Sequence, residues 1–232
     1  MTLSIMQPYL FPYIGYFQLM QAADKFVVYD DVNFINRGWI NRNRLLINSR
    51  EFLFSVPIKE ASQFKKINEL VIDDSQRWRE KLLKTIAQGY KKAPHFDNVF
   101  QVVSRIVYTP TEKLNELLFS NLQEIATYLQ LPIRLVETSA IYQNQHLKAQ
   151  DRILDICKKE EANRYVNAIG GQELYNKETF NSQGITLQFQ QSHKVEYQQF
   201  GNDFVPWLSI IDVLMFNSIE QTQDLLKAYN LV

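Results

Sequence analysis

Two clusters of side chains near the N-terminus are suited to binding a small molecule. The prolines of the first cluster restrict its backbone, its glycine permits close approach of a ligand, and its tyrosines carry hydroxyl groups on rigid rings. This combination predicts a ligand-binding loop, with a proline-braced turn around core aromatic rings as the alternative. The residues of this first cluster are Gln7, Pro8, Tyr9, Pro12, Tyr13, Gly15 and Tyr16.

The second cluster is rich in arginine and asparagine. Arginine matches carboxylate or phosphate groups in shape, and a neighbouring tryptophan favours a ligand over the alternative, a solvent-facing hairpin. If the segment is extended, its side chains alternate between two faces, with Arg42 and Arg44 on one of them, so only one set can face a ligand. The candidate binding residues are Arg37, Trp39, Asn41, Arg42 and Asn43, with Arg44 as a further contact for an anion.

Three aspartates are candidates for a general base: Asp30, Asp31 and Asp212. A carboxylate beside arginines stays ionised, while burial raises its pKa towards the range in which it can accept a proton. The alternatives are a helix cap or an ion pair for Asp30 and Asp31, and an anchor for Arg37 or Arg42 in the case of Asp212. Carboxylates also bind magnesium, but the spacing here matches no specific metal signature, so we predict no metal site.

The other groups with reactive side chains are scattered along the sequence. His95, His146 and His193 are far apart and fit no metal or triad spacing, and Cys157 is expected to be a small buried hydrophobic residue. The pair Gly170–Gly171 predicts either a tight turn alone or a turn that leads into a helix N-terminus, where anions bind.

The elements that position these clusters alternate between strands and helices. Apolar runs predict strands over 3–6 and 25–29 with a helix over 15–23 between them. The first cluster follows the first strand and the second cluster follows the second strand. Because parallel strands end at one edge of a sheet, where ligands bind, we expect the two clusters to lie together.

Further elements extend the same pattern. A helix over 73–90 should start at an Asp73 cap, and a helix over 109–129 should start at Thr109, with Pro110 in its first turn.

The alternation of strands and helices predicts a Rossmann-like α/β fold with a mostly parallel sheet, a helical insertion and C-terminal helices. We expect one domain over 1–232, with a mainly helical segment around 74–130. Other strands are expected over 52–58, 132–136, 164–168 and 186–190, and helices over 151–159 and, as a pair split at a Ser218–Gln221 capping box, over 206–229.

Composition and charge exclude several classes of protein. The 232 residues are 46% hydrophobic and 22% charged, which is typical of a globular protein and excludes global disorder. With 25 basic and 25 acidic residues, the chain has no overall field to hold nucleic acid. A single cysteine and the lack of a long apolar run predict a cytoplasmic protein without disulfides or a membrane span.

Several of these segments together resemble the WbqC-like protein family. The resemblance covers nearly the whole chain and is most specific near the N-terminus. Its motifs are Gln7 to Phe17 (QPYLFPYIGYF), Asp30 to Phe34 (DDVNF), Arg37 to Asn43 (RGWINRN), Tyr90 to Pro94 (YKKAP), the Gly170–Gly171 pair with Leu174 and Tyr175, and Ser209 to Asp212 (SIID).

The resemblance implies a bacterial transferase. Members of the family occur with genes for O-antigen and other surface polysaccharides, and some are described as glycine transferases. We therefore expect a small-molecule or activated-sugar substrate, with transfer of a glycyl, aminoacyl or related group to a sugar precursor. The resemblance does not identify a cofactor.

Two alternatives remain. The chain shows no triad, metal set or phosphate loop, which fits a non-catalytic protein that binds an anionic ligand. The first strand, proline-containing loop and helix also resemble nucleotidylyltransferases, which suggests an enzyme of that kind. In this chain Gly15 is followed by Tyr16, where that superfamily has a histidine that contacts phosphates. This departure argues against adenylyl transfer by that mechanism.

Overall fold

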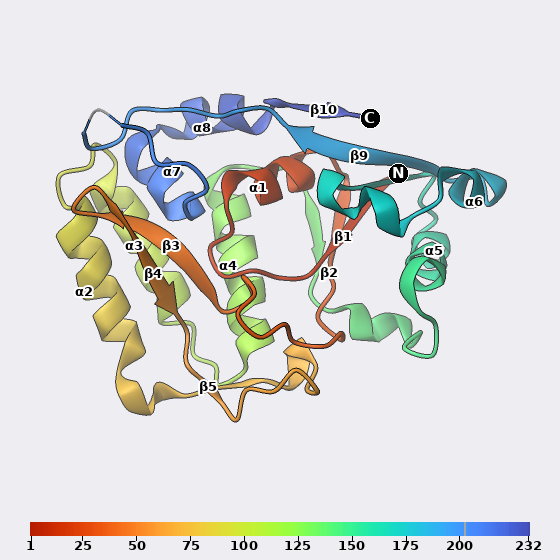
Figure 1. Cartoon of the computed structure of the whole chain (residues 1–232), viewed down its shortest axis with the longest axis horizontal. Coiled ribbons are helices and arrows are strands. Elements are labelled where there is room, and N and C mark those ends of the chain that lie inside the picture. The colour runs from red at the N-terminus through yellow and green to blue at the C-terminus, as the bar shows by residue number, and fades with distance from the viewer. Residues whose placement is uncertain (202) are drawn as a thin grey trace.

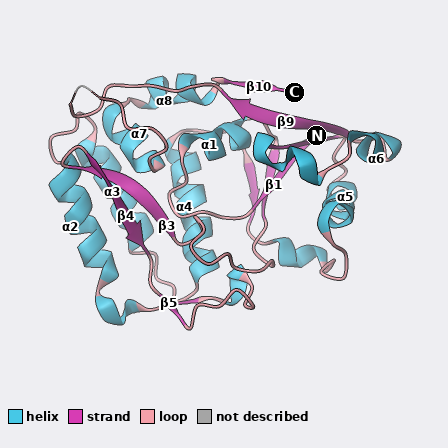
Figure 2. Cartoon of the chain, in the orientation of Figure 1, coloured by secondary structure: helices cyan, strands magenta, loops and turns pink. Residues whose placement is uncertain are grey.

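A mostly parallel sheet forms the centre of the molecule (Figures 1 and 2). The computed structural model describes residues 1–201 and 203–232. In this part of the chain the sheet has six strands in the order β10-β9-β8-β1-β2-β7, and only β10 runs antiparallel to its neighbour. The mixed α/β fold with a mostly parallel sheet is therefore confirmed. The strands are β1 (Thr2–Met6), β2 (Lys25–Val28), β7 (Arg134–Val136), β8 (Arg164–Ala168), β9 (Thr186–Ser192) and β10 (Tyr229–Leu231).

The strand order reverses at β1. The chain adds β2 and β7 on one side of β1 and then returns to add β8 and β9 on the other side. In open sheets of this kind, ligands bind outside the carboxyl ends of the strands at the point of reversal. The loop that follows β1 therefore occupies the position where a ligand is expected.

Both faces of the sheet are covered by helices. Neighbouring residues of a strand point to opposite faces, so each strand contributes side chains to two cores. Val27 packs with α5 (Ala149–Lys159) and α6 (Lys177–Ser182) in one core, whereas Phe26 and Val28 belong to the other, larger core. The larger core also holds α1 (Ile14–Gln21), α7 (Ile210–Phe216) and α8 (Ile219–Leu226). Every helix in the described ranges is too short or too polar to serve as a membrane span.

A helical group and a hairpin extend the larger core to one side (Figure 1). The helices are α2 (Trp78–Tyr90), α3 (Phe96–Val107) and α4 (Leu114–Tyr128). The hairpin joins β3 (Arg42–Ile47) to β4 (Arg50–Ser55) as a separate antiparallel sheet, and β5 (Ile58–Lys59) pairs with β6 (Val71–Ile72). Short 3-10 turns complete the chain: η1 (Ile67–Glu69), η2 (Asp74–Gln76), η3 (Ser139–Tyr142) and η4 (Ile169–Leu174).

Several predicted boundaries were wrong for local reasons. Asp73 does cap a turn, but it caps η2, and Arg77 then adopts a left-handed conformation (φ 51°) before α2 begins. Thr111 binds the backbone N–H of Lys113, so α4 begins at Leu114 and not near Thr109. Helix α3 and strand β10 were not predicted.

Other predictions agree with the structure. Strand β8 has the predicted bounds, and β1, α1 and β2 follow in the predicted order. The Ser218–Gln221 capping box is present at the start of α8 and separates it from α7. The arginine-rich segment and residues 52–58, however, contribute the two strands of the β3–β4 hairpin and do not belong to the central sheet.

Candidate functional site

The loop after β1 is fixed by two buried amide side chains. Asn43 Nδ2 donates to the carbonyl oxygens of Leu10 and Phe11, at 3.0 and 2.8 Å. Asn121 donates to the Tyr9 carbonyl and accepts from the Phe11 N–H, both at 3.1 Å. These bonds satisfy the backbone of the loop, so that the rings of Tyr9 and the nearby Tyr13 are held at a defined place near the sheet edge.

The arginine-rich segment folds back on itself before it becomes a strand. A turn closes with the Gly38 N–H donating to the carbonyl of Ile35, and Arg42 donates to the carbonyls of Gly38 and Arg37. The guanidinium carbons of Arg42 and Arg44 lie 5.6 and 5.1 Å from the centre of the Trp39 ring. The tryptophan is thus held by two cation–π contacts while its ring stays partly exposed.

A segment far along the chain, the turn before α7, completes the site. The Ser209 N–H donates to the Arg44 carbonyl and its hydroxyl donates to the Phe11 carbonyl, both at 2.9 Å. Arg44 also donates to the carbonyl of Trp207, at 3.3 Å. Trp207 has a left-handed backbone (φ 60°), and the residue is 66% exposed. Ser209 is therefore the N-cap of α7, and Trp207 precedes the helix in which it was expected to lie.

These three segments enclose a first cavity of about 290 Å³, which we call the Trp39 cavity. Five of the residues predicted to contact a ligand line it: Tyr9, Tyr13, Trp39, Asn43 and Arg44. The alternation of faces was predicted for an extended segment, but residues 37–41 form turns and bends before β3 begins at Arg42. Asn43 and Arg44, from the two predicted sets, both line the cavity. The remaining lining residues are Pro12 and Trp207.

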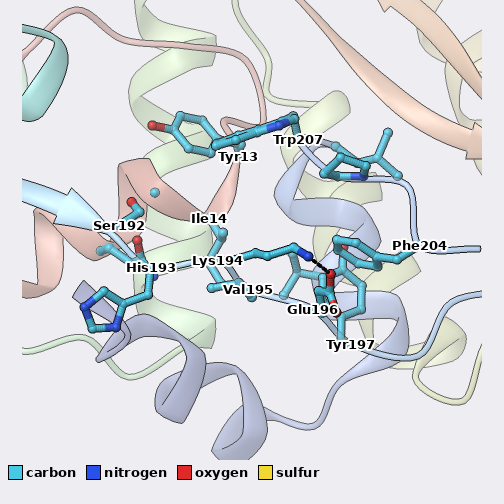
Figure 3. Close-up of a pocket in the computed structure, with 15 residues that line it drawn as sticks. Tyr13, Ile14, Ser192, His193, Lys194, Val195, Glu196, Tyr197, Phe204 and Trp207 are labelled. Atoms are coloured by element: carbon cyan, nitrogen blue, oxygen red, sulfur yellow. Dashed lines mark ion pairs between the residues drawn. The ribbon is translucent and has the colours of Figure 1, made fainter.

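A second cavity of about 260 Å³ lies between α1 and the segment after β9, and we call it the α1 cavity (Figure 3). It shares Tyr13 and Trp207 with the Trp39 cavity, and their ring centres are 5.8 Å apart. The two cavities are therefore neighbours across one pair of aromatic rings. Residues from α1 and α7 that line it are Ile14, Gly15, Gln18 and Val213, and Ser192 lines it from the end of β9. Those from the segment after β9 include His193, Lys194, Val195, Glu196, Tyr197, Phe204 and Leu208.

The other predicted binding residues lie outside the Trp39 cavity. The Gln7 carbonyl accepts a hydrogen bond from the buried Tyr16 hydroxyl, at 2.9 Å, so this pair braces the loop from behind. Asn41 binds the backbone of Val56, and Arg37 is exposed on the turn. Gly15 lines the α1 cavity, where a Cβ atom would overlap the Tyr13 ring.

Asp30 and Asp31 lie together at the end of β2, in a closed polar cluster. Asp30 accepts hydrogen bonds from Thr138, Ser139 and Asn115. Burial raises the pKa of Asp30, although the hydrogen bonds from Thr138 and Asn115 oppose the shift.

Asp31 forms a buried ion pair with Arg152 and accepts further hydrogen bonds from Ser139 and Gln145. Burial alone would raise the pKa of Asp31, but the bonds from Ser139 and Arg152 outweigh it and hold the pKa below its ordinary value.

Asp212 lies apart from this pair, on α7. Its carboxylate accepts hydrogen bonds from the Tyr90 hydroxyl, the Tyr197 hydroxyl and the Gln199 amide, each at 2.7 Å. Burial raises the pKa of Asp212 against these bonds. Its partners differ from the predicted anchor to Arg37 or Arg42. Because Tyr197 lines the α1 cavity, Asp212 is one hydrogen bond away from it.

The remaining candidate residues do not line the Trp39 cavity or the α1 cavity, which together we call the cleft, with the exception of His193. Cys157 is buried, and burial raises the pKa of its thiol to about 12. Of the three histidines, His193 lines the α1 cavity. Gly170 and Gly171 lie within η4 and do not lead directly into an α-helix, since α6 begins at Lys177. Residues 1–201 and 203–232 contain no cluster of acidic, histidine or cysteine side chains able to hold a metal ion.

Two lining residues of the Trp39 cavity were not predicted to contact a ligand: Pro12, which was predicted only to restrict the backbone of the first cluster, and Trp207. A tryptophan next to a proline, just ahead of a capping serine, was the available signal for Trp207.

Comparison with known proteins places the chain in a family. The uncharacterized protein Rv1507c of Mycobacterium tuberculosis (strain ATCC 25618 / H37Rv) is 28% identical over 228 residues, which cover 97% of this chain and 96% of that protein. No solved structure matches the chain. The sequence profile of the WbqC-like protein family matches residues 7–224, a range that contains the loop after β1, the arginine-rich segment and α7. This protein therefore belongs to the WbqC-like protein family.

Proposed function

We propose that this protein is a transferase that binds an activated sugar of bacterial surface-polysaccharide biosynthesis in the Trp39 cavity. The observation that carries the proposal is the composition of this cavity, in which four aromatic side chains surround one arginine. Aromatic rings stack on the faces of nucleobases and sugars, and arginine binds phosphate groups. A nucleotide-activated sugar offers both kinds of group in one molecule. The volume of about 290 Å³ holds one of its rings with the adjoining phosphate, and the rest of the molecule would extend over the exposed side chains of Trp39 and Trp207.

The arginine is held in a way that leaves it able to bind. Arg44 pairs with Glu51 at 2.8 Å and binds the Trp207 carbonyl, yet its Nε atom has no hydrogen-bond partner among the described residues. A buried donor without a partner destabilises the free protein, so a phosphate or carboxylate oxygen at this position would gain a charge-assisted hydrogen bond.

The sheet supports the same location. From β1, the chain adds β2 and β7 on one side and β8 and β9 on the other, which gives the order β7-β2-β1-β8-β9. This is the order of a doubly wound fold, and from it we infer a Rossmann-like arrangement. In such folds the loop after the first strand contacts the ligand, and here that loop supplies Tyr9 and Tyr13. Family membership supports an association with surface polysaccharides and transfer of a glycyl, aminoacyl or related group.

The sequence predicts Asp30, Asp31 or Asp212 as a general base, and we propose a different role for the one that adjoins a cavity. Asp30 and Asp31 are enclosed by hydrogen-bond partners and do not line either cavity, whereas Asp212 adjoins the α1 cavity through Tyr197. We therefore favour Asp212 over Asp30 and Asp31 as the carboxylate that influences the reaction. It would act as a positioning residue, through the Tyr197 hydroxyl.

Ligand-dependent unfolding tests this proposal. We expect a panel of nucleotide sugars to include one that raises the Tm of the wild-type protein, because a ligand that binds the folded state stabilises it. The rise should be lost in Arg44→Ala and Trp39→Ala. It should persist in Arg105→Ala, a matched control whose arginine pairs with Glu124 on the surface of α3 and α4. A rise that persists in Arg44→Ala would contradict the proposed site.

A non-catalytic protein that binds an anionic ligand is the second candidate. It is favoured because Asp30 and Asp31 are enclosed by hydrogen-bond partners and are not free to act as a base. The carboxylate of Glu196, which lines the α1 cavity, is also already paired with Lys194. Product formation at catalytic protein concentration from the nucleotide sugar found in the screen would exclude this candidate.

A further inference from the structure

The α1 cavity is built mostly from apolar side chains. Ile14, Val195, Leu208 and Val213 line it together with the ring of Phe204. Its volume of about 260 Å³ is slightly below the range typical of sites for drug-sized ligands, which begins at about 300 Å³. A single small ring or a short chain is therefore the size of group that fits.

The charged groups on its lining neutralise one another. Lys194 and Glu196 form an ion pair at 2.6 Å, drawn as the dashed line in Figure 3. In the same view the imidazole of His193 lies at the end of the cavity away from Phe204. A charged group buried in an apolar cavity is costly unless it finds a partner, and here the ammonium group of Lys194 is already paired with Glu196 at the exposed rim. The cavity thus selects against an ion.

The wall between the two cavities is a pair of rings. Tyr13 and Trp207 line both cavities, so a ligand in either one contacts the same pair. The backbone on each side of this wall is held by hydrogen bonds, since Ile210 N–H donates to Pro12 and Ser209 N–H donates to Arg44.

We propose that the α1 cavity is a second ligand site, which takes an uncharged aliphatic or aromatic group and adjoins the Trp39 cavity across the Tyr13–Trp207 ring pair. The inference deepens the proposed function by adding a place for an apolar part of a second substrate. The inference rests on the proposed function only in assuming that an activated sugar binds in the Trp39 cavity. Binding at the α1 cavity can be measured without any nucleotide sugar.

Three small probes test the site on the full-length protein. Fluorobenzene, observed by ¹⁹F NMR, and 1-hexanol are neutral, whereas benzoate has similar size and carries a charge. We expect both neutral probes to bind more tightly than benzoate. Benzoate binding more tightly than fluorobenzene would overturn the proposal.

Two variants locate the probes. Val195→Trp fills the cavity from a half-buried position and should weaken fluorobenzene binding at least tenfold, while Ile141→Trp, at an exposed position on η3, should leave it unchanged. Glu196→Gln removes the ion-pair partner of Lys194, so benzoate should bind about two- to fivefold more tightly, which corresponds to the strength of an exposed ion pair. Fluorobenzene binding should be unchanged in this variant. Because Glu196 is exposed, this variant tests the site even if Val195→Trp does not fold.

Tryptophan fluorescence reports on the shared wall. The chain has three tryptophans, of which Trp78 is buried at the start of α2, so in Trp39→Phe a change of emission on adding fluorobenzene comes from Trp207. Unchanged fluorobenzene binding in Val195→Trp and unchanged benzoate binding in Glu196→Gln would together refute the second site. Neutral probes that bind as expected while no nucleotide sugar binds would refute only the proposed function.

Discussion

The polar cluster at the end of β2 and the aromatic cleft after β1 lie at the same edge of the sheet, but they are built in opposite ways. In the cluster, Asp30 and Asp31 are buried and each accepts several hydrogen bonds, and Arg152 is buried with them. In the cleft, the rings of Trp39 and Trp207 are open to solvent. The closed cluster has its partners within the protein, whereas the open cleft has surface left for a ligand.

This difference shows that position at a sheet edge does not by itself make a binding residue. A polar group whose hydrogen bonds are all made inside the protein stabilises the fold, and removing one partner leaves another buried and unpaired. An exposed ring that few contacts hold in place costs little to change and is free to stack on a ligand. Substitutions in the two regions should therefore affect different measurements.

The largest effect is expected from Arg152→Ala. It leaves the Asp31 carboxylate buried without its charged partner, which typically costs about 3–5 kcal/mol of unfolding free energy. Urea unfolding at pH 7 measures this cost. The double variant Arg152→Met with Asp31→Asn, which removes both charges, should recover part of the loss. A cost below about 1 kcal/mol in Arg152→Ala would show that the cluster is not a structural ion pair.

Acidification should sharpen the same contrast. Because the pKa of Asp31 is lower in the folded protein than its ordinary value of 3.8, its stabilising contribution is present above pH 3.8. The contribution is lost as the pH falls through the folded pKa. The stability difference between the wild type and Asp31→Asn should therefore be large at pH 7 and smaller at pH 3. For the exposed control Asp224→Asn, the stability difference from the wild type should stay small at both pH 7 and pH 3. A stability difference between the wild type and Asp31→Asn that is larger at pH 3 than at pH 7 would contradict the lowered pKa of Asp31.

A smaller loss is expected from Tyr90→Phe. The Tyr90 hydroxyl donates to Asp212 and accepts from the Leu46 N–H, at 2.7 Å in both cases. Its removal leaves that amide unpaired and takes one donor from a buried carboxylate, at a cost of about 1.5–3 kcal/mol in urea unfolding. Tyr128→Phe, at a half-buried position on α4, should change stability by much less. Equal costs in the two variants would show that the Asp212 network contributes little.

The smallest effect on stability is expected from Gly15→Ala in the cleft. The added Cβ atom overlaps the Tyr13 ring, which must shift, while alanine favours the helix by up to about 1 kcal/mol. Thermal unfolding should change little, whereas ligand binding to the cleft should weaken because Tyr13 lines both cavities. Gly170→Ala, where a Cβ atom meets no other atom within 4 Å, serves as the matched control. Unaltered ligand binding in Gly15→Ala would argue against a role for Tyr13.

The sequence by itself determined the elements whose signals are local. Alternating apolar runs predicted β1, α1, β2 and β8, and the capping box at Ser218 predicted the start of α8, because these patterns depend on neighbours within a few residues. The two N-terminal clusters were located by the same means, since each follows its own strand.

Only the tertiary structure decided which residues of those clusters meet. Trp207 reaches Tyr13, and Tyr90 reaches Asp212, across large separations in sequence, and no local pattern encodes such contacts. Similarly, nothing local distinguishes Asp31, closed off by Arg152, from Trp39, left open in the cleft. Packing between distant segments determines which polar groups are satisfied, and that determines which groups remain free for a ligand.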